Sequence, residues 1–296
     1  MMNGIICLDK PQDYTSFDVI ARMRGMTGIR KIGHAGTLDP MATGVLPLLI
    51  GRATKACDLL PSEEKRYTAE FQLGITTDTQ DSTGTVLRQC REPVSRAQLE
   101  AVLPLFTGEI WQLPPMYSAV QVKGQRLYDL ARQGREVERE RRAVRIDSLV
   151  LLRYDEAKRN GTLDIRCSRG TYVRTIIHDM GEQLGVGGCL TALRRTEASG
   201  FTLADCITME EAQRFAETGG FERSLIPIAR VFSGCPSIRL NEVQTRMFQN
   251  GVRLDLNRLH YQKQDGLHAV YGPDETFLGI ARLDLETMEL RVAAFF

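Results

Sequence analysis

The stretch Gly33–Gly44 reads GHAGTLDPMATG and leads directly into the apolar run VLPLLIG at Val45–Gly51. It contains only two ionisable side chains, His34 and Asp39. Pro40 restricts Asp39 to extended backbone conformations, and the glycines allow a ligand to approach the backbone closely. The apolar run is typical of a strand that is buried on both faces. The pattern therefore predicts a carboxylate on an open loop beside a rigid strand.

Nucleotide-binding loops do not explain this stretch. A phosphate-binding loop requires GxxxxGK[ST], and the run Gly36–Thr43 contains no lysine. The dinucleotide pattern GxGxxG is also absent from it. Two interpretations of Asp39 stay open on spacing alone. It is either a carboxylate that attacks or stabilises a sugar carbon, or an aspartate that caps a turn, which is the commoner role of an Asp-Pro pair.

The composition indicates an ordinary globular protein that works in the cytoplasm. The chain has 296 residues, of which 43% are hydrophobic and 25% charged, and its formal net charge is +1. No apolar run reaches the roughly 18 residues that span a bilayer. The seven cysteines are scattered and never spaced CxxC, and the four histidines are not at metal-ligand spacing. We therefore expect reduced thiols, no metal and no cofactor.

The periodicity predicts an α+β fold with a mixed sheet. Strands are expected at Ile5–Leu8 and Tyr67–Leu73, and Thr15 begins a helix with a capping box that ends at Asp18. The segment Ser95–Phe106 has the spacing of one amphipathic helix. The pattern changes near Ser233–Pro236. We therefore expect a domain over residues 1–232 and a small β-rich domain over residues 233–296.

Two segments concentrate positive charge. Residues 22–31 contain four basic side chains and no acid, and residues 126–145 contain seven arginines and four acids. Such segments suit contacts with nucleic acid, although interspersed acids are equally typical of a solvated, salt-bridged surface.

Several collinear motifs resemble those of the TruB family of pseudouridine synthases, over nearly all of the first 230 residues. The family pattern GHxGxLDPxAxG matches the opening stretch. The other matching motifs are LDKPxxxTS at Leu8–Ser16, KRY at Lys65–Tyr67, PPxYSA at Pro114–Ala119, LYxxAR at Leu127–Arg132, GTYVRT at Gly170–Thr175 and LRR at Leu193–Arg195. The resemblance implies a pseudouridine-synthase-like fold with a mostly antiparallel central sheet. It also implies, more loosely, a PUA-like tail that binds RNA.

The resemblance implies an isomerase that converts uridine 55, in the T-arm of tRNA, to pseudouridine. Asp39 would be the catalytic aspartate, and Arg174 would pair with it. Tyr67 would pack against the target base and relay a proton. Tyr172 and Leu193 would line the uracil pocket, and His34 would stack in the space that the flipped uridine leaves. Whether the aspartate attacks C1′ or C6, or a glycal forms, stays open.

The same resemblance implies where RNA binds. The Arg-rich segment, about residues 117–145, would be a mobile insertion that clamps the T-arm of a tRNA bound by a monomer. The basic side chains expected to contact RNA are Arg22, Arg24, Lys31, Arg126, Arg132, Arg141 and Arg142. Two residues depart from the family pattern. Asp13 stands where many members have glycine, and Gln121 stands where many have lysine, which removes one expected phosphate contact.

Two alternatives remain on the same scaffold. The first is a non-catalytic tRNA-binding protein or folding chaperone, which would have no use for Asp39. The second is the RNA-guided relative that modifies ribosomal RNA, which the absence of long basic tails disfavours.

Overall fold

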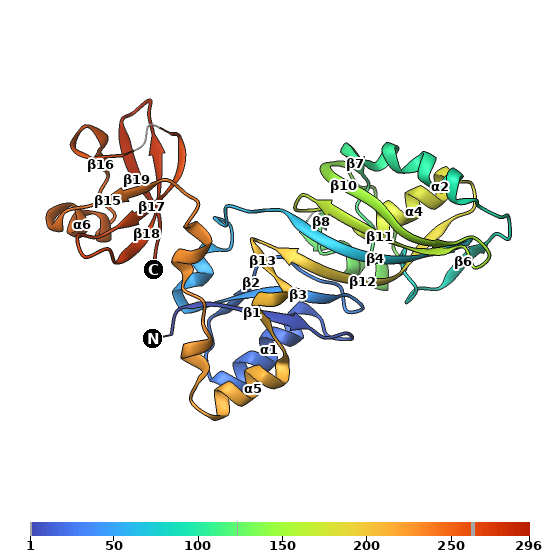
Figure 1. The fold of residues 1–296 in the computed structure, drawn as a ribbon, viewed down its shortest axis with the longest axis horizontal. Helices are drawn as coiled ribbons and strands as arrows, with labels where there is room; N and C mark the ends of the chain where they lie inside the picture. The colour runs from blue at the N-terminus through green and yellow to red at the C-terminus, as the bar shows by residue number, and fades with distance from the viewer. Residues whose placement is uncertain (1, 123, 262–263) are drawn as a thin grey trace.

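The computed structural model describes residues 2–122, 124–261 and 264–296. One large sheet forms the body of the molecule, and a small β-rich domain lies at one end of it (Figure 1). The large sheet has the strand order β14-β1-β3-β12-β4-β11-β10-β7, with β2 paired to β3 and β13 paired to β12. Its strands are β1 (Gly4–Lys10), β2 (Ile32–His34), β3 (Thr43–Ile50), β4 (Lys65–Leu73), β7 (Gly108–Gln112), β10 (Arg142–Asp155), β11 (Asn160–Cys167), β12 (Gly188–Ala198), β13 (Phe201–Thr202) and β14 (Cys206–Ile207).

The sheet is mixed and mostly antiparallel, which confirms the predicted fold class. Only the pairs β1–β14 and β3–β12 are parallel within it. Strand β12 lies between β3 and β4, which are consecutive long strands in the sequence. Residues from distant parts of the chain therefore meet at the centre of the sheet.

Helices cover the sheet in two groups. Helices α1 (Ser16–Thr27) and α5 (Met209–Glu217) lie together under the β1–β3 half, and α2 (Arg96–Val102) and α4 (Val173–Gln183) lie on the other half (Figure 1). The expected capping box is present, because Thr15 caps α1 and Asp18 returns the hydrogen bond. Short 3-10 helices lie between these elements: η1 (Gly51–Ala56), η2 (Leu103–Phe106), η3 (Leu203–Asp205), η4 (Phe221–Ser224), η5 (Ile228–Phe232) and η6 (Leu256–Arg258).

The predicted strand periodicities are confirmed. On β4, Tyr67, Ala69, Phe71 and Leu73 are all buried, in alternation with more exposed residues. On β3, every residue after Thr43 is buried, because hydrophobic clusters cover both of its faces. The prediction of one helix over Ser95–Phe106 is wrong. Helix α2 ends at Val102 and a 3-10 turn follows, since Pro104 has no N–H to continue the α-helical hydrogen bonds.

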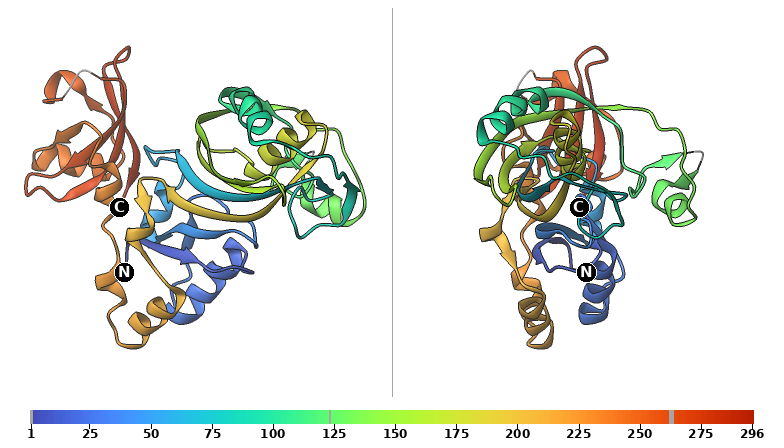
Figure 2. Two further views of the ribbon diagram at one scale, coloured as in Figure 1. Left: turned by 45° about the vertical axis from the view of Figure 1, so that its right-hand side comes forward. Right: turned by 90° about the vertical axis from the view of Figure 1, so that its right-hand side faces the viewer.

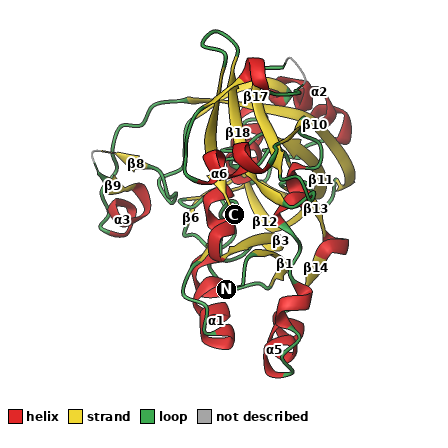
Figure 3. Ribbon diagram, turned by 90° about the vertical axis from the view of Figure 1, so that its left-hand side faces the viewer, coloured by secondary structure: helices red, strands yellow, loops and turns green. Residues whose placement is uncertain are grey.

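The predicted insertion stands away from the body of the sheet (Figure 2, right; Figure 3). It carries a short hairpin of β8 (Gln121–Val122) and β9 (Gln125–Arg126), followed by helix α3 (Leu127–Arg132). A second hairpin, β5 (Ile75–Thr77) and β6 (Val86–Gln89), follows β4.

The C-terminal segment forms a five-stranded sheet, which confirms a small β-rich domain. Its order is β15-β17-β18-β19-β16, and helix α6 (Glu242–Gln249) packs beside it. The strands are β15 (Ser237–Arg239), β16 (Leu254–Asp255), β17 (Gly266–Tyr271), β18 (Phe277–Asp284) and β19 (Glu289–Phe295). One side of this sheet packs on the larger domain, where the ammonium of Lys55 lies 4.5 Å from the centre of the Phe295 ring. The exact division at residue 232 stays a prediction.

Candidate active site

A buried arginine on β12 holds the loop that carries Asp39. Arg195, on β12, is completely buried. Its Nε donates to the carbonyl of Val45 at 2.7 Å, and its two terminal nitrogens donate to the carbonyls of Thr37 at 3.3 Å and Gly36 at 3.1 Å. These three bonds tie the loop to the centre of the sheet.

The other side of the loop is held by α1 and the turn before it. The amide of Leu38 donates to the hydroxyl of Ser16 at 2.9 Å, at the start of α1. Lys10 is fully buried, and its ammonium donates to the carbonyl of Pro40 at 3.2 Å. Burial lowers the pKa of Lys10 to about 8, although the charge of Asp39 opposes this shift. The position of the carboxylate is therefore set by contacts from three separate elements.

Asp13, which departs from the family pattern, takes part in this support. Its backbone has a φ of 66°, a left-handed conformation that favours glycine and that aspartate tolerates better than most residues. Its amide donates to the carbonyl of Pro40 at 2.9 Å. The structure thus accommodates Asp13 at a turn for which glycine is the easier residue.

Six of the residues predicted for the site line one cavity of about 380 Å³. They come from β2, the loop after it, β4, the start of α4 and β12. The six residues are His34, Asp39, Tyr67, Tyr172, Arg174 and Leu193. The structure therefore brings these residues together, while their individual roles stay predictions.

Arg174 lies between two carboxylates at the base of the cavity. Its side chain is 5% exposed. One terminal nitrogen lies 3.5 Å from the Asp39 carboxylate and the other lies 3.6 Å from that of Asp81. It also donates to the carbonyl of Tyr117. The Asp39 carboxylate is 37% exposed, so it is paired on one side and accessible from the cavity on the other.

Two tyrosines, Tyr67 and Tyr172, form part of the cavity wall, and the phenol group of each is neutral. Burial raises the pKa of both Tyr67 and Tyr172, so each hydroxyl keeps its proton at neutral pH and can donate it in a hydrogen bond. The side chain of Gln112 exchanges two hydrogen bonds of 3.0 Å with the backbone of Tyr172. Leu193 supplies an apolar surface from β12.

His34 lies at the rim of the cavity. Burial lowers its pKa, and the positive charges of Arg195 and Lys65 lower it further, so the imidazole is neutral at pH 7. Its ring packs edge-on against Phe17, with 5.8 Å between the ring centres. Phe17 is 62% exposed, so these two rings offer an aromatic surface beside the opening.

Sequence reasoning missed several residues that build the site. Arg195 and Lys65 stand inside the LRR and KRY motifs, but neither was assigned a role there. Asp81 belongs to a turn-rich segment that shows no periodicity, and Gln112 gives no local signal at all. Their importance depends on contacts between distant elements.

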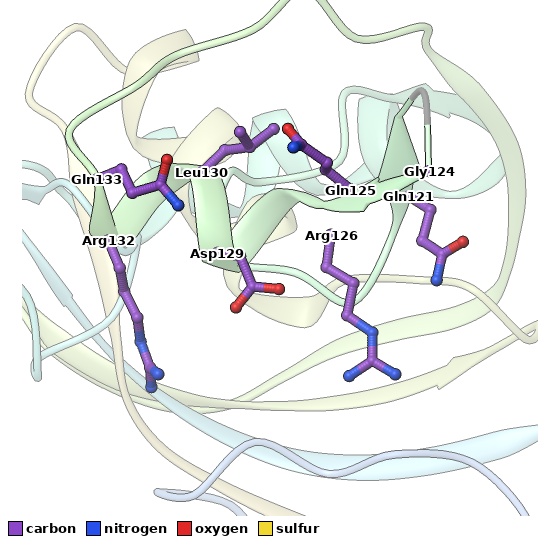
Figure 4. Close-up of a pocket in the computed structure, with 8 residues that line it drawn as sticks. All are labelled: Gln121, Gly124, Gln125, Arg126, Asp129, Leu130, Arg132 and Gln133. Carbon is purple, nitrogen blue, oxygen red and sulfur yellow. The ribbon is translucent and has the colours of Figure 1, made fainter.

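The predicted RNA-contact residues do not line this cavity. Arg22, Arg24 and Lys31 are exposed on or just after α1, and Arg141 and Arg142 are exposed at the start of β10. On the insertion, the side chains of Arg126 and Arg132 point to the same side of a cavity of about 620 Å³ (Figure 4). Both guanidinium groups lie near the Tyr128 ring, at 5.8 and 5.6 Å from its centre. Their contact with RNA stays a prediction.

Within residues 2–122, 124–261 and 264–296, no group of three or more His, Cys, Asp or Glu side chains could hold a metal ion. In the same part of the chain, no helix is long and apolar enough to cross a membrane.

Comparison with known proteins identifies the class to which this fold and site belong. The family model of the TruB family pseudouridylate synthase N-terminal domain matches residues 24–173. The model of the tRNA pseudouridylate synthase B C-terminal domain matches residues 174–231. The chain therefore belongs to the TruB family of pseudouridylate synthases.

Individual relatives are similar in sequence to this chain over almost its whole length. The chain is 46% identical to tRNA pseudouridine synthase B of Stutzerimonas stutzeri (strain A1501), over 95% of its own length and 92% of the relative's. It is 39% identical to the protein of that name from Clostridium tetani (strain Massachusetts / E88), over 98% of both chains. A chain in a solved H/ACA RNP bound to a substrate RNA containing 2′-deoxyuridine has the same fold. Its TM-score is 0.75 at 22% identity, with 99% of this chain and 84% of that chain covered.

Proposed function

We propose that this chain isomerises a specific uridine of tRNA to pseudouridine, and that the uridine is position 55 in the T-arm. The reaction class follows from membership of the TruB family and from relatives named tRNA pseudouridine synthase B. The choice of the T-arm rests on the motifs shared with the family. The observation that carries the proposal is the Asp39 carboxylate, held by Arg174 at 3.5 Å and open to a cavity.

The reaction moves a bond without changing the composition of the substrate. The bond between N1 and C1′ breaks, the uracil ring turns, and a bond between C5 and C1′ forms. C5 then loses its proton, and N1 ends with a proton. No electron acceptor is required, and one positioned carboxylate can stabilise or trap the sugar while the uracil is detached.

The walls of the cavity suit a detached uracil. Tyr67 and Leu193 present apolar surface next to Asp39, and both side chains are at least 90% buried. Such walls exclude water that would otherwise hydrolyse the reaction intermediate. The neutral hydroxyl of Tyr67 is available to move a proton between ring positions.

The target base must leave its stack to enter this cavity. Unstacking costs a few kcal/mol and is offset by stacking replacements and phosphate contacts. We assign the replacement role to the neutral ring of His34 at the rim. We assign phosphate contacts to the basic side chains of α1 and the insertion, which together clamp the T-arm.

We also propose that the enzyme acts as a monomer and works in the cytoplasm. Light scattering during size-exclusion chromatography, with and without a tRNA stem-loop, tests the monomer. One protein bound per RNA is the expected result, and a dimer at working concentration would contradict it.

The decisive experiment measures tritium release from a T-arm stem-loop that carries 5-tritiated uridine. The wild-type chain is expected to release tritium, and Asp39→Asn is expected to bind the stem-loop without releasing it. Asp155→Asn serves as a matched control, since Asp155 is an exposed aspartate at the end of β10, outside the active-site cavity. Tritium release by Asp39→Asn would refute the assigned carboxylate. No release by the wild type would favour a protein that only binds or folds RNA.

A further inference from the structure

A second, smaller cavity continues from the first. It has a volume of about 120 Å³ and shares four lining residues with the active-site cavity: His34, Gly36, Lys65 and Arg169. Its far side is lined by Cys57, Asp58, Leu60, Ser62, Glu63 and Ser199. The two adjoining cavities are together called the groove, and Lys65 and Arg169 line both of them.

Lys65 is directed into this groove. It lies two residues before Tyr67 on β4, and residues at this spacing point to the same face of a strand. A Cβ atom added to Gly36, on the loop opposite, would come within 3.3 Å of the Lys65 ammonium. The ammonium is thus held between the strand and the loop that carries Asp39.

The Lys65 ammonium at this junction is not paired with a close carboxylate. Within the described part of the chain, no carboxylate oxygen lies within 4.0 Å of the Lys65 ammonium or the Arg195 guanidinium. Arg195 instead donates to backbone carbonyls. Burial, with a smaller contribution from the positive charge of Arg195, lowers the pKa of Lys65 to about 8. The partly buried Lys65 ammonium has no carboxylate partner, so an anion that enters the groove would be favoured there.

Arg169 can also bind such an anion with little loss of stability. Its side chain is 59% exposed and lies 3.8 Å from the Asp58 carboxylate and 3.7 Å from the Glu63 carboxylate. Long, exposed ion pairs of this kind contribute little to stability. The Arg169 guanidinium can therefore exchange these partners for a group that enters the groove.

We propose that Lys65 binds the phosphodiester that joins the target uridine to one neighbouring nucleotide, and that the smaller cavity receives the sugar of that neighbour. This inference rests on the proposed function, because it places the uracil in the adjoining cavity. A phosphodiester is the anion that an RNA substrate brings to this position. The small volume suits a phosphate and a ribose edge, and the open side of the groove leaves room for the neighbouring base.

The experiment uses three T-arm stem-loops. One has only phosphodiesters, and the other two carry a neutral methylphosphonate on the 5′ or the 3′ side of the target uridine. Pseudouridine formation and RNA affinity are measured for the wild type, Lys65→Met and Lys65→Arg. Lys158→Met is the matched control, since Lys158 is 74% exposed on the turn between β10 and β11.

One of the two methylphosphonates is expected to lower kcat/KM of the wild type roughly tenfold to a hundredfold, the range for a hydrogen bond to a charged group. Lys65→Met should show the same loss with the unmodified RNA and no further loss with that methylphosphonate. Lys65→Arg should restore most of the activity, and Lys158→Met should match the wild type.

Two results would overturn the inference. The first is full activity of Lys65→Met, and the second is an equal, additive loss on all three RNAs, which would indicate a structural role for the lysine. The affinities are also measured in the Asp39→Asn background, where no turnover occurs. Coupling between Lys65 and one phosphate in these affinities decides the inference even if the wild type forms no pseudouridine, a result that would refute only the proposed function.

Discussion

The guanidinium of Arg174 lies 3.5 Å from the carboxylate of Asp39, which the cavity exposes. The same guanidinium lies 3.6 Å from the carboxylate of Asp81, which is 5% exposed. One arginine therefore connects the solvent-accessible site to a buried acid. Positioning of Asp39 and stability of the interior depend on the same side chain.

This arrangement predicts separate effects on stability and activity. Arg174→Met leaves Asp81 buried without its cation, so the free energy of unfolding should fall by about 3–5 kcal/mol, and pseudouridine formation should cease. The double variant Arg174→Met/Asp81→Asn should recover much of the stability and none of the activity. Urea denaturation and tritium release measure the two properties. An Arg174→Met protein as stable as the wild type would contradict the buried ion pair.

The backbone at Gly44, at the end of the loop that carries Asp39, has no room for a side chain. Its φ is 102°, and an added Cβ would lie 2.1 Å from the carbonyl oxygen of Arg195. Gly44→Ala is therefore expected to lower the free energy of unfolding by more than about 3 kcal/mol, through strain and displacement of β12 from β3. Gly25→Ala is the control, because Gly25 lies in α1 with no atom within 4 Å of an added Cβ. That change should stabilise the protein by roughly 0.5–1 kcal/mol. Comparable stability of the two variants would disprove this explanation.

The lowered pKa of Lys65 predicts how RNA affinity depends on pH. Its pKa is lowered to about 8, so the ammonium is charged at pH 7 and loses its proton as the pH rises through 8. RNA affinity should therefore be constant from pH 6.5 to about 7.5 and should fall by pH 9. The charged groups that act on Lys65 in this range are Arg195, Arg169 and Glu63.

Lys65→Arg is the matched variant for this measurement, since arginine keeps its charge over the whole range. Lys10 also has a pKa of about 8, and it is present in both proteins. The contribution of Lys65 is therefore the difference between the two pH profiles, obtained by fluorescence titration. Identical profiles would show that Lys65 does not contact the RNA.

We expect the two arginines of the insertion to make a salt-dependent contribution to RNA binding. Arg126 and Arg132 project to the same side of the insertion (Figure 4). If each neutralises one phosphate, replacing both by glutamine should reduce the slope of log affinity against log salt by roughly 1.4–1.8. Arg96→Gln is the control, because Arg96 is an exposed arginine on α2, paired with Glu100. An unchanged slope in the double variant would remove these arginines from the RNA interface.

The sequence predicted the parts of the fold that depend on local chemistry. Alternation on Tyr67–Leu73 and the capping box at Thr15 each follow from a few neighbouring residues, and both are confirmed. The helix expected over Ser95–Phe106 is shorter than predicted, because the missing amide of Pro104 outweighs favourable apolar spacing. The apolar side chains of Leu99 and Leu103 are buried there, although the backbone is not one continuous α-helix.

The candidate site was predictable only where motifs carry it. Asp39 and Arg174 lie in recognisable motifs, and the structure brings them together. Asp81 and the buried Lys10 were not predicted, because their partners lie on other elements and the sequence contains no record of those distances. The placement of β12 between β3 and β4 was also beyond local pattern, since strand order depends on tertiary packing.

That strand order also determines when the enzyme can become active during its synthesis. Strand β12 supplies Leu193 and Arg195 and separates β3 from β4, yet it is made more than a hundred residues after them. A nascent chain that ends before Gly188 has no strand to join the Asp39 half of the sheet to the Tyr67 half. Closure of such distant pairings is a late and slow event in folding. Ribosome-bound fragments should therefore be catalytically silent until β12 emerges, so tRNA meets a competent enzyme only after most of the chain has been translated.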